Sequence, residues 1–341
     1  MKNLKGLTIE ELQEFFLEIG EKKFRAKQVY EWIYKGALSF DEMTNISKDL
    51  RDKLNEKAYI STLDIEVVQQ SKTDGTRKYL FNLGDGNAIE SVFMKYKYGN
   101  SLCVSGQAGC RMGCKFCAST LGGLKRNLEA FEIVDEILAV ERETGEKINH
   151  IVVMGTGEPL DNYENLSKFI KIINSKEGLN IGMRNITVST CGLVPMILKF
   201  AEDFPQVNLA ISLHGPNDDI RGSMMPINNK YSVRELIDAC KTYVSKTNRR
   251  ITFEYTLVAD KNDSKENINQ LIGLLRGINC HVNLIPLNKV TESGLNSSSR
   301  KNAENIARRL EGAGITATVR RELGADIDAA CGQLRLNKNK A

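Results

Sequence analysis

The sequence predicts an α/β fold, a partial (β/α)6 TIM-like barrel preceded by a helical region and a β-meander. From about residue 99 onward, short apolar runs of strand length alternate with amphipathic helical stretches. Repeated β–α units form a parallel sheet with right-handed crossovers. Six such units are too few to close an eight-stranded barrel, so the sequence favours a partial one.

The N-terminal region, residues 1–60, predicts a small helical domain. Leu12, Phe15, Phe16 and Ile19 recur at helical spacing, and a second apolar stripe follows between residues 24 and 33. A third helix is expected at about residues 47–58.

The next segment, residues 61–98, predicts a β-meander that leads into the barrel. Strand-like runs lie at 63–70, 77–83 and 88–95. Asp74-Gly75 and Asp85-Gly86 separate them, and Asp-Gly pairs are typical of hairpin turns.

The barrel is expected to occupy residues 99–335, with a basic tail at 336–341. Its strands are predicted at 102–105, 151–154, 186–189, 207–212, 251–258 and 282–286, with a final β-rich piece at 316–320. Helices are predicted at 128–143, 166–173, 233–243, 268–275 and 302–310. In barrels of this kind the chemistry lies at the C-terminal ends of the strands.

The composition limits the class of protein. Apolar residues make up 41% and charged residues 26% of the 341 residues, as in ordinary soluble proteins. No apolar run approaches the length of a membrane span, and the N-terminus lacks a signal-peptide core, so a cytoplasmic protein is expected. The net charge of +4 permits an RNA partner without requiring one. Eight cysteines in a cytoplasmic protein need a reason other than structural disulfides.

Three of these cysteines form a Cys-x3-Cys-x2-Cys motif, Cys110, Cys114 and Cys117, after the first barrel strand. Three close thiolates suit a soft metal or an iron–sulfur cluster, and three ligands leave one iron of a four-iron cluster open. The alternatives are a zinc site or three unrelated buried cysteines. Zinc usually needs a fourth ligand, and no histidine lies closer than His150.

Polar residues follow several of the later barrel strands. Glycine-rich residues 155–159 place Glu158 where it could meet the ammonium group of a ligand. Ser189, the run 212–214 and Asn288 lie at the ends of other strands, where they could bind ribose hydroxyls or a carboxylate. Each of these positions has an alternative interpretation as a turn or helix-cap residue.

The stretch Cys110-Arg-Met-Gly-Cys114-Lys-Phe-Cys117 resembles the signature of radical S-adenosylmethionine (SAM) enzymes. The resemblance implies a [4Fe-4S] cluster whose open iron binds SAM and whose electron cleaves it to a 5′-deoxyadenosyl radical. It also implies a set of SAM contacts: Gly157, Glu158, Ser189, Ser212, Leu213, His214 and Asn288.

The C-terminal run, residues 320–334, narrows the resemblance because Cys331 lies there between small residues. With the cysteine loop and residues 155–162, this run is similar to the RlmN family of ribosomal RNA adenine-C2 methyltransferases, which has C8-methylating resistance relatives. The similarity covers about residues 79–335. It implies that Cys331 carries the methyl group, Glu90 accepts a proton and Cys103 releases the product by forming a disulfide. Without it, both cysteines would be packing residues and Glu90 a solvent-facing strand residue.

The chemistry explains why such residues are needed. Carbon 2 of adenine has no lone pair and cannot attack the methyl group of SAM, whereas a cysteine thiolate can. The resemblance therefore implies S-methylation of Cys331 by one SAM and radical formation from a second, in ping-pong order. Cys191, Cys240 and Cys280 match no such role and are interpreted as packing residues.

The implied activity is formation of 2-methyladenosine at position 2503 of 23S rRNA and at position 37 of some tRNAs. Three alternatives stay open: C8 methylation, another radical SAM reaction and a non-catalytic metal-binding RNA module. The expected partners are 23S rRNA, tRNA and an electron donor such as flavodoxin or ferredoxin, with no membrane and a monomeric chain. Lys125-Arg126 and Arg320-Arg321 are the favoured RNA contacts, since they flank the proposed active-site segments.

Overall fold

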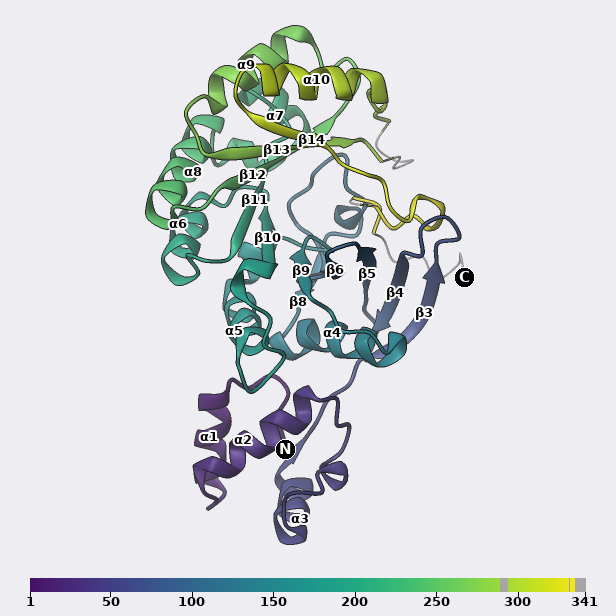
Figure 1. Ribbon diagram of the computed structural model, residues 1–341, viewed down its shortest axis with the longest axis vertical. Coiled ribbons are helices and arrows are strands. Elements are labelled where there is room, and N and C mark those ends of the chain that lie inside the picture. Colours follow the sequence, from purple (N-terminus) through teal and green to yellow (C-terminus); the bar gives the residue numbers. More distant parts are fainter. Residues whose placement is uncertain (289–293, 331, 335–341) are drawn as a thin grey trace.

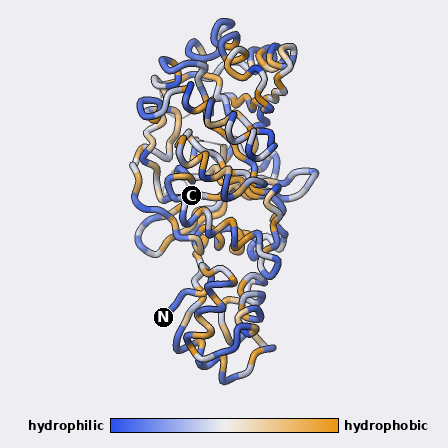
Figure 2. The backbone as a smooth tube through the Cα atoms, turned by 90° about the vertical axis from the view of Figure 1, so that its left-hand side faces the viewer, coloured by the Kyte–Doolittle hydropathy of each residue, from blue (hydrophilic) through white to orange (hydrophobic). Residues whose placement is uncertain are grey.

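The computed structural model describes residues 1–288, 294–330 and 332–334. Its N-terminal helices lie at one end of the long axis, helices α9 (Lys265–Leu275) and α10 (Arg300–Gly312) lie at the other, and the sheet runs between them (Figure 1). Hydrophobic segments gather in the interior, while many outer turns are hydrophilic (Figure 2). Among the described residues, no helix is both long enough and apolar enough to cross a membrane.

The N-terminal region contains the three predicted helices, α1 (Ile9–Glu18), α2 (Lys23–Tyr34) and α3 (Lys48–Lys57). Thr8 begins α1 with a capping box, because its hydroxyl accepts the Glu11 N–H while the Glu11 carboxylate accepts the Thr8 N–H. Two short strands, β1 (Lys2–Asn3) and β2 (Ala58–Tyr59), pair in parallel and close this region.

One ten-stranded sheet forms the rest of the fold, in the order β14-β13-β12-β11-β10-β9-β6-β5-β4-β3. Strands β6 and β9–β14 run parallel, and β3–β5 extend them as the predicted antiparallel meander. The bounds are β3 (Asp64–Gln70), β4 (Arg77–Asn82), β5 (Ala88–Tyr96), β6 (Gly99–Val104), β9 (His150–Val153), β10 (Ile186–Thr190), β11 (Asn208–Ser212), β12 (Ile251–Leu257), β13 (Cys280–Pro286) and β14 (Thr316–Val319).

The prediction of a partial α/β barrel is confirmed, and the β-rich piece at 316–320 forms a further parallel strand beside β13. Helices follow the strands: α4 (Ala130–Thr144), α5 (Tyr163–Asn174), α6 (Val194–Asp203), α7 (Asp218–Met224), α8 (Val233–Thr247), α9 and α10. Helices α6 and α7 were not among the helices predicted from the sequence. Helix α7 has only seven residues, too few to show helical periodicity, although Asn217 caps it.

The N-terminal helices and the barrel share one hydrophobic core, which runs from Leu4 to Ala317. A buried ion pair crosses the same junction. Lys5 Nζ lies 2.6 Å from Asp135 Oδ1 of α4, and these side chains are 1% and 0% exposed. Burial lowers the pKa of Lys5, and the Asp135 carboxylate opposes that shift. The same carboxylate accepts the N–H of Leu63 and so ties the entry of β3 to α4.

We expect Lys5→Met to lower the free energy of unfolding by about 3–5 kcal/mol, because it leaves the Asp135 carboxylate buried without its counter-charge. Urea denaturation measures the loss. Lys53→Met is the matched control, since the Lys53–Glu21 pair is partly exposed and should cost less than about 1 kcal/mol. Equal losses in the two variants would contradict a special role for the buried pair.

Candidate active site

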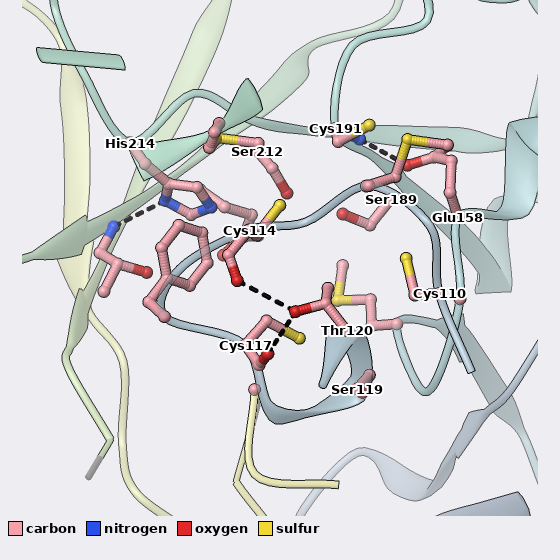
Figure 3. Close-up of a pocket in the computed structure, with 18 of the residues that line it drawn as sticks. Cys110, Cys114, Cys117, Ser119, Thr120, Glu158, Ser189, Cys191, Ser212 and His214 are labelled. Carbon is pink, nitrogen blue, oxygen red and sulfur yellow. Dashed lines mark hydrogen bonds between the residues drawn. The ribbon is translucent and has the colours of Figure 1, made fainter. Parts of the chain in front are cut away.

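A pocket lies at the C-terminal ends of the parallel strands and encloses about 1030 Å³, including its open mouth. The cysteine loop forms one side and the strand ends form the other (Figure 3). The predicted residues whose side chains line it are Cys110, Cys114, Cys117, Glu158, Ser189, Ser212, His214 and Asn288, together with Gly157. The structure therefore gathers most of the predicted ligand contacts in one cavity.

The cysteine loop is closed at its base by a two-stranded ribbon that the sequence analysis did not predict. Strands β7 (Gln107–Gly109) and β8 (Leu124–Asn127) pair in antiparallel fashion, and Cys110 N–H donates to the Gly123 carbonyl at 3.2 Å. The ribbon holds both ends of the loop together. All three sulfurs consequently approach the cavity from one short segment.

The chemistry of the three thiols fits an iron–sulfur cluster. Burial raises the pKa of Cys110 to about 12 and raises that of Cys114 as well, and the neighbouring Cys117 raises both further. Such thiols ionise when a metal centre binds them and replaces their protons. Within the described ranges, no group of three or more His, Cys, Asp and Glu side chains is placed to hold a single metal ion.

The loop after β9 packs closely on the segment that leads into the cysteine loop. Gly157 has φ +109°, and a Cβ there would lie 2.6 Å from the Gln107 Cβ, so this position requires glycine. The Glu158 N–H donates to Gln107 Oε1 at 2.8 Å. The two segments therefore fix each other, and the loop after β9 is held in place where Gly157 and Glu158 line the pocket.

The Glu158 carboxylate is 3% exposed and is held by two backbone donors. Its Oε1 accepts the Leu160 N–H at 3.1 Å and its Oε2 accepts the Cys191 N–H at 2.7 Å. Burial raises its pKa, and the hydrogen bond from Cys191 opposes that rise. Since a carboxylate has further acceptor sites, Glu158 can still receive a ligand ammonium group.

The three residues predicted at the end of β11 differ in whether their side chains reach the pocket. Ser212 and His214 line the pocket, whereas the Leu213 side chain is fully buried in the core. Leu213 meets the neighbouring strand through its backbone, because its N–H donates to the Glu254 carbonyl at 3.1 Å. The structure therefore does not bring the Leu213 side chain to the cavity.

His214 is fixed as a neutral imidazole. Its Nδ1 accepts the Thr256 backbone N–H at 2.9 Å, so the proton sits on Nε2, which is a hydrogen-bond donor. Burial, aided by the positive charge of Arg221, lowers the pKa of His214 to about 3. Its ring meets Phe116 of the cysteine loop edge-on, with centroids 4.8 Å apart.

This pKa predicts an acid-dependent loss of stability. Between pH 6.5, the ordinary value, and about 3, the unfolded imidazole binds a proton that the folded one does not. The contribution of His214 is therefore present above pH 6.5 and is lost as the pH falls, at about 1.4 kcal/mol per pH unit. Denaturation curves between pH 4 and 7 should show a shallower pH slope for His214→Asn than for the unchanged protein. Identical slopes would contradict the assignment.

Glu90 and Cys103 lie on the inner face of the sheet. Cys103 of β6 stands opposite Val92 of β5, and Glu90 shares the face of Val92 because it lies two residues away on the same strand. Lys78 Nζ lies 3.5 Å from Glu90 Oε1. Both predicted residues are buried, so Glu90 is not the solvent-facing residue of the alternative interpretation.

The C-terminal segment covers this inner face and reaches the cysteine loop. Ala329 and Leu334 pack with Val92 and Cys103 in one apolar cluster. The Ala118 N–H donates to the Gly332 carbonyl at 2.8 Å, and the Ser119 hydroxyl donates to the Leu334 carbonyl at 3.0 Å. Cys331 itself lies outside the described residues.

The structure also adds pocket residues that the sequence analysis did not assign, chiefly Thr120, Cys191, Glu254 and Thr256. Cys191 packs against Cys114, yet it also lines the cavity, so its interpretation as a packing residue was incomplete. Cys240 and Cys280 lie in the core, as predicted. Glu254 lies in the middle of β12, so a search for polar residues at strand ends does not find it.

Of the predicted RNA-contacting cations, Arg126 is engaged within the fold. Its guanidinium forms ion pairs with Asp85 and Glu132 and so joins a turn of the meander to α4. Lys125 is exposed, and Arg320 lines the pocket near Glu254. The RNA contact at Arg126 stays a prediction, and its guanidinium, 31% exposed, is already paired within the fold.

Comparison with known proteins adds independent information. Residues 2–60 match the family described as the ribosomal RNA large subunit methyltransferase N-terminal domain, and residues 104–272 match the radical SAM superfamily. Proteins named "Probable dual-specificity RNA methyltransferase RlmN" from Thermoanaerobacter sp. (strain X514) and Clostridium perfringens (strain SM101) are each 56% identical over 336 residues. These alignments span 98% of this chain, and 98% and 97% of the respective relatives.

A solved structure, a radical SAM methyltransferase from Sphaerobacter thermophilus, superposes with a TM-score of 0.93 at 45% identity. The match covers 98% of this chain and 99% of that one. The barrel and the cysteine loop together thus place this chain in the class of radical SAM proteins. Identity over nearly the whole length narrows this further: the chain belongs to the RlmN family of radical SAM methyltransferases, as the sequence analysis predicted.

Proposed function

We propose that this chain methylates carbon 2 of adenosine in RNA, at position 2503 of 23S rRNA and at position 37 of some tRNAs. Its similarity to proteins named as dual-specificity RNA methyltransferases supports two kinds of RNA substrate. One structural observation carries the proposal. The segment that flanks Cys331 contacts both the cysteine loop and the inner sheet face that carries Glu90 and Cys103.

In this proposal Cys110, Cys114 and Cys117 hold a [4Fe-4S] cluster with one open iron. When bound, the cluster supplies the electron that cleaves SAM to methionine and a 5′-deoxyadenosyl radical. The SAM contacts are Gly157, Glu158, Ser189, Ser212, Leu213 through its backbone, His214 and Asn288. Glu158 receives the ammonium group, and the neutral His214 offers its Nε2–H as a donor that does not titrate near neutral pH.

Residues of the chain itself carry out the remaining steps of the reaction. The Cys331 thiolate takes a methyl group from a first SAM and becomes a thioether. After loss of a hydrogen atom to the radical, the methylene carbon bonds to carbon 2 of the adenine. Glu90 removes the ring proton, and the nearby Lys78 stabilises its carboxylate charge. The Cys103 thiolate then attacks the Cys331 sulfur and forms a disulfide, which breaks the bond between that sulfur and the product carbon. The released carbon takes up a proton to become the methyl group, and the one surplus electron of the adduct returns to the electron carrier that supplied it.

The test is anaerobic reconstitution with SAM and 23S rRNA, followed by mass spectrometry of the digested RNA and measurement of 5′-deoxyadenosine. The proposal predicts 2-methyladenosine, whereas the C8 alternative predicts 8-methyladenosine. Iron and sulfide analysis of the same protein addresses the non-catalytic alternative, which predicts bound zinc and no SAM cleavage. A protein that modifies RNA without an iron–sulfur cluster would overturn the proposal.

Cys103→Ala is expected to leave RNA covalently attached to the protein, because no second thiol remains to attack the Cys331 sulfur. A denaturing gel with labelled RNA should show a retarded band that proteinase digestion removes. Cys280→Ala, which changes a core cysteine of β13, should show none. Repeated turnover by Cys103→Ala without any retarded band would exclude this role for Cys103.

The proposal also covers the location of the protein, its oligomeric state, its electron donor and its domains. We infer a cytoplasmic, monomeric enzyme that receives electrons from a flavodoxin or ferredoxin. We also propose the division into residues 1–60, 61–98, 99–335 and 336–341, in which the first region contributes RNA contacts. Its exposed cationic residues, such as Lys22 and Lys23, suit a phosphate backbone.

A further inference from the structure

Arg221 of α7 is a fully buried cation that the proposed function does not use. Its side chain ranks among the largest fully buried ones and is 1% exposed. Burying a guanidinium is costly unless an opposite charge compensates it. Across the part of the chain that the structure describes, no carboxylate lies within ion-pair distance of Arg221.

The hydrogen bonds of Arg221 go to neutral acceptors. Nη2 donates to the backbone carbonyl of Cys191 at 2.5 Å and to that of Ser212 at 3.4 Å, and Nη1 donates to Asn228 Oδ1 at 3.1 Å. The buried Nε has no hydrogen-bond partner among the described residues. These contacts satisfy donors and join the ends of β10 and β11, but they do not neutralise a full positive charge.

The fold holds Arg221 rigidly in this position. A Cβ on Gly215 would lie 2.6 Å from the Arg221 nitrogen and 2.8 Å from its Cα, so the turn after β11 packs directly on the backbone of α7. Asn217 caps the helix by accepting the Ile220 N–H at 2.9 Å. The guanidinium is thus placed by two tightly packed backbones.

The cysteine loop lies against this cation. The Lys115 N–H donates to the Met224 carbonyl at the end of α7, and Met224 packs with Cys114 and Cys191 in one apolar cluster. Arg221 donates a hydrogen bond to the backbone carbonyl of Cys191, which belongs to the same cluster as Cys114. Arg221 is not among the residues that line the cavity, so it lies behind the wall that the ligand meets. Its charge therefore acts on the cysteine loop through an apolar layer, where screening is weak.

We propose that Arg221 is the buried counter-charge of the iron–sulfur cluster and raises its reduction potential. The inference rests on the proposed function, since it requires a cluster on Cys110, Cys114 and Cys117. Reduction moves one electron from a low-potential electron-transfer protein to the cluster, which becomes one unit more negative while the donor becomes one unit more positive. A fixed cation nearby stabilises the reduced form, because net charge near a cluster is a main determinant of its potential. Arg221 stays protonated throughout.

The test uses the reconstituted full-length enzyme and a redox titration followed by the EPR signal of the reduced cluster, with and without SAM. Arg221→Met and Arg221→Gln remove the charge, and Arg221→Lys keeps it. We expect both neutral variants to lower the equilibrium constant for reduction at least about tenfold, which is about 59 mV for one electron. Arg221→Lys should stay much closer to the unchanged protein, since its ammonium keeps the charge.

Two controls separate charge from structure. Asn228→Ala removes an acceptor of Arg221 but keeps the cation, and should lower stability without moving the potential. Arg234→Met removes an exposed cation from the next helix, α8, and should change neither.

Each outcome of the redox titration either supports or contradicts the proposed role of Arg221. A neutral variant that holds its cluster at an unchanged potential overturns the proposal, as does unfolding of all three variants, which would make Arg221 a purely structural residue. If only Arg221→Lys retains the cluster, the result supports the proposal, because the positive charge is then required to hold the cluster. Iron and sulfide analysis of the unchanged protein separates this inference from the proposed function. Absence of a cluster there contradicts the function itself.

Discussion

Replacing Cys331 with alanine is expected to lower methyl transfer to RNA by more than about 10⁴-fold while SAM cleavage continues. The variant has no sulfur to carry the methyl group, so no carbon reaches the adenine. The proposed cluster ligands and SAM contacts are unchanged, so 5′-deoxyadenosine should still form. Mass spectrometry of the digested RNA and quantification of 5′-deoxyadenosine measure both products in one sample.

Cys240→Ala is the matched control for this variant, because it removes a fully buried cysteine of α8 in the hydrophobic core. It should keep both products, with some loss of stability from the small cavity that it leaves. Methyladenosine formed by Cys331→Ala at a rate near that of the unchanged protein would exclude the S-methylcysteine route. That result would favour a different radical SAM reaction.

Cys114→Ala is expected to abolish both products. Cys114 is buried in the centre of the cysteine loop, and two thiolates from one short loop do not hold a four-iron cluster stably. Iron and sulfide per chain should fall sharply, and 5′-deoxyadenosine and methyladenosine should both fall to background. The two variants therefore separate the steps, since only Cys331→Ala keeps SAM cleavage.

Cys280→Ala provides the comparison here, because it removes a cysteine of similar burial on β13 that faces the core. It should keep its iron, its sulfide and its activity. Full iron content in Cys114→Ala would show that this residue is not a ligand. The assignment of the motif would then be wrong.

Local sequence was sufficient to predict the helices and strands that have a clear hydrophobic pattern or turn motif of their own. The helices α4 and α8 have long amphipathic stripes, and the meander has Asp-Gly turns between its strands, so their existence follows from spacing alone. The ribbon of β7 and β8 was missed because its strands have only three and four residues. Pairing between residues 107 and 127 is visible only when the chain is folded.

Some residues of the candidate site can likewise be predicted from local sequence, and others cannot. The cysteine motif marks Cys110, Cys114 and Cys117 by its spacing, while Arg221 carries no local signal that it is buried. Lys125 and Arg126 are adjacent in sequence, yet among the described residues Arg126 alone of the two has ion-pair partners, because Asp85 and Glu132 approach it from other elements. Which cation is neutralised depends on long-range contacts that a one-dimensional pattern does not contain.

The partial barrel, the three-cysteine loop and the family resemblance can all be predicted from the amino-acid sequence, because each depends on residue types at short, regular spacing. The folded chain is needed to show which residues share the cavity and that Glu90 and Cys103 face inward with the C-terminal segment. It is also needed to show that Arg221 lies behind Cys191 with no carboxylate of the described residues within ion-pair distance. The physical reason is that burial and electrostatic pairing are properties of neighbours in space. Residues separated by more than a hundred positions become neighbours only when the sheet forms.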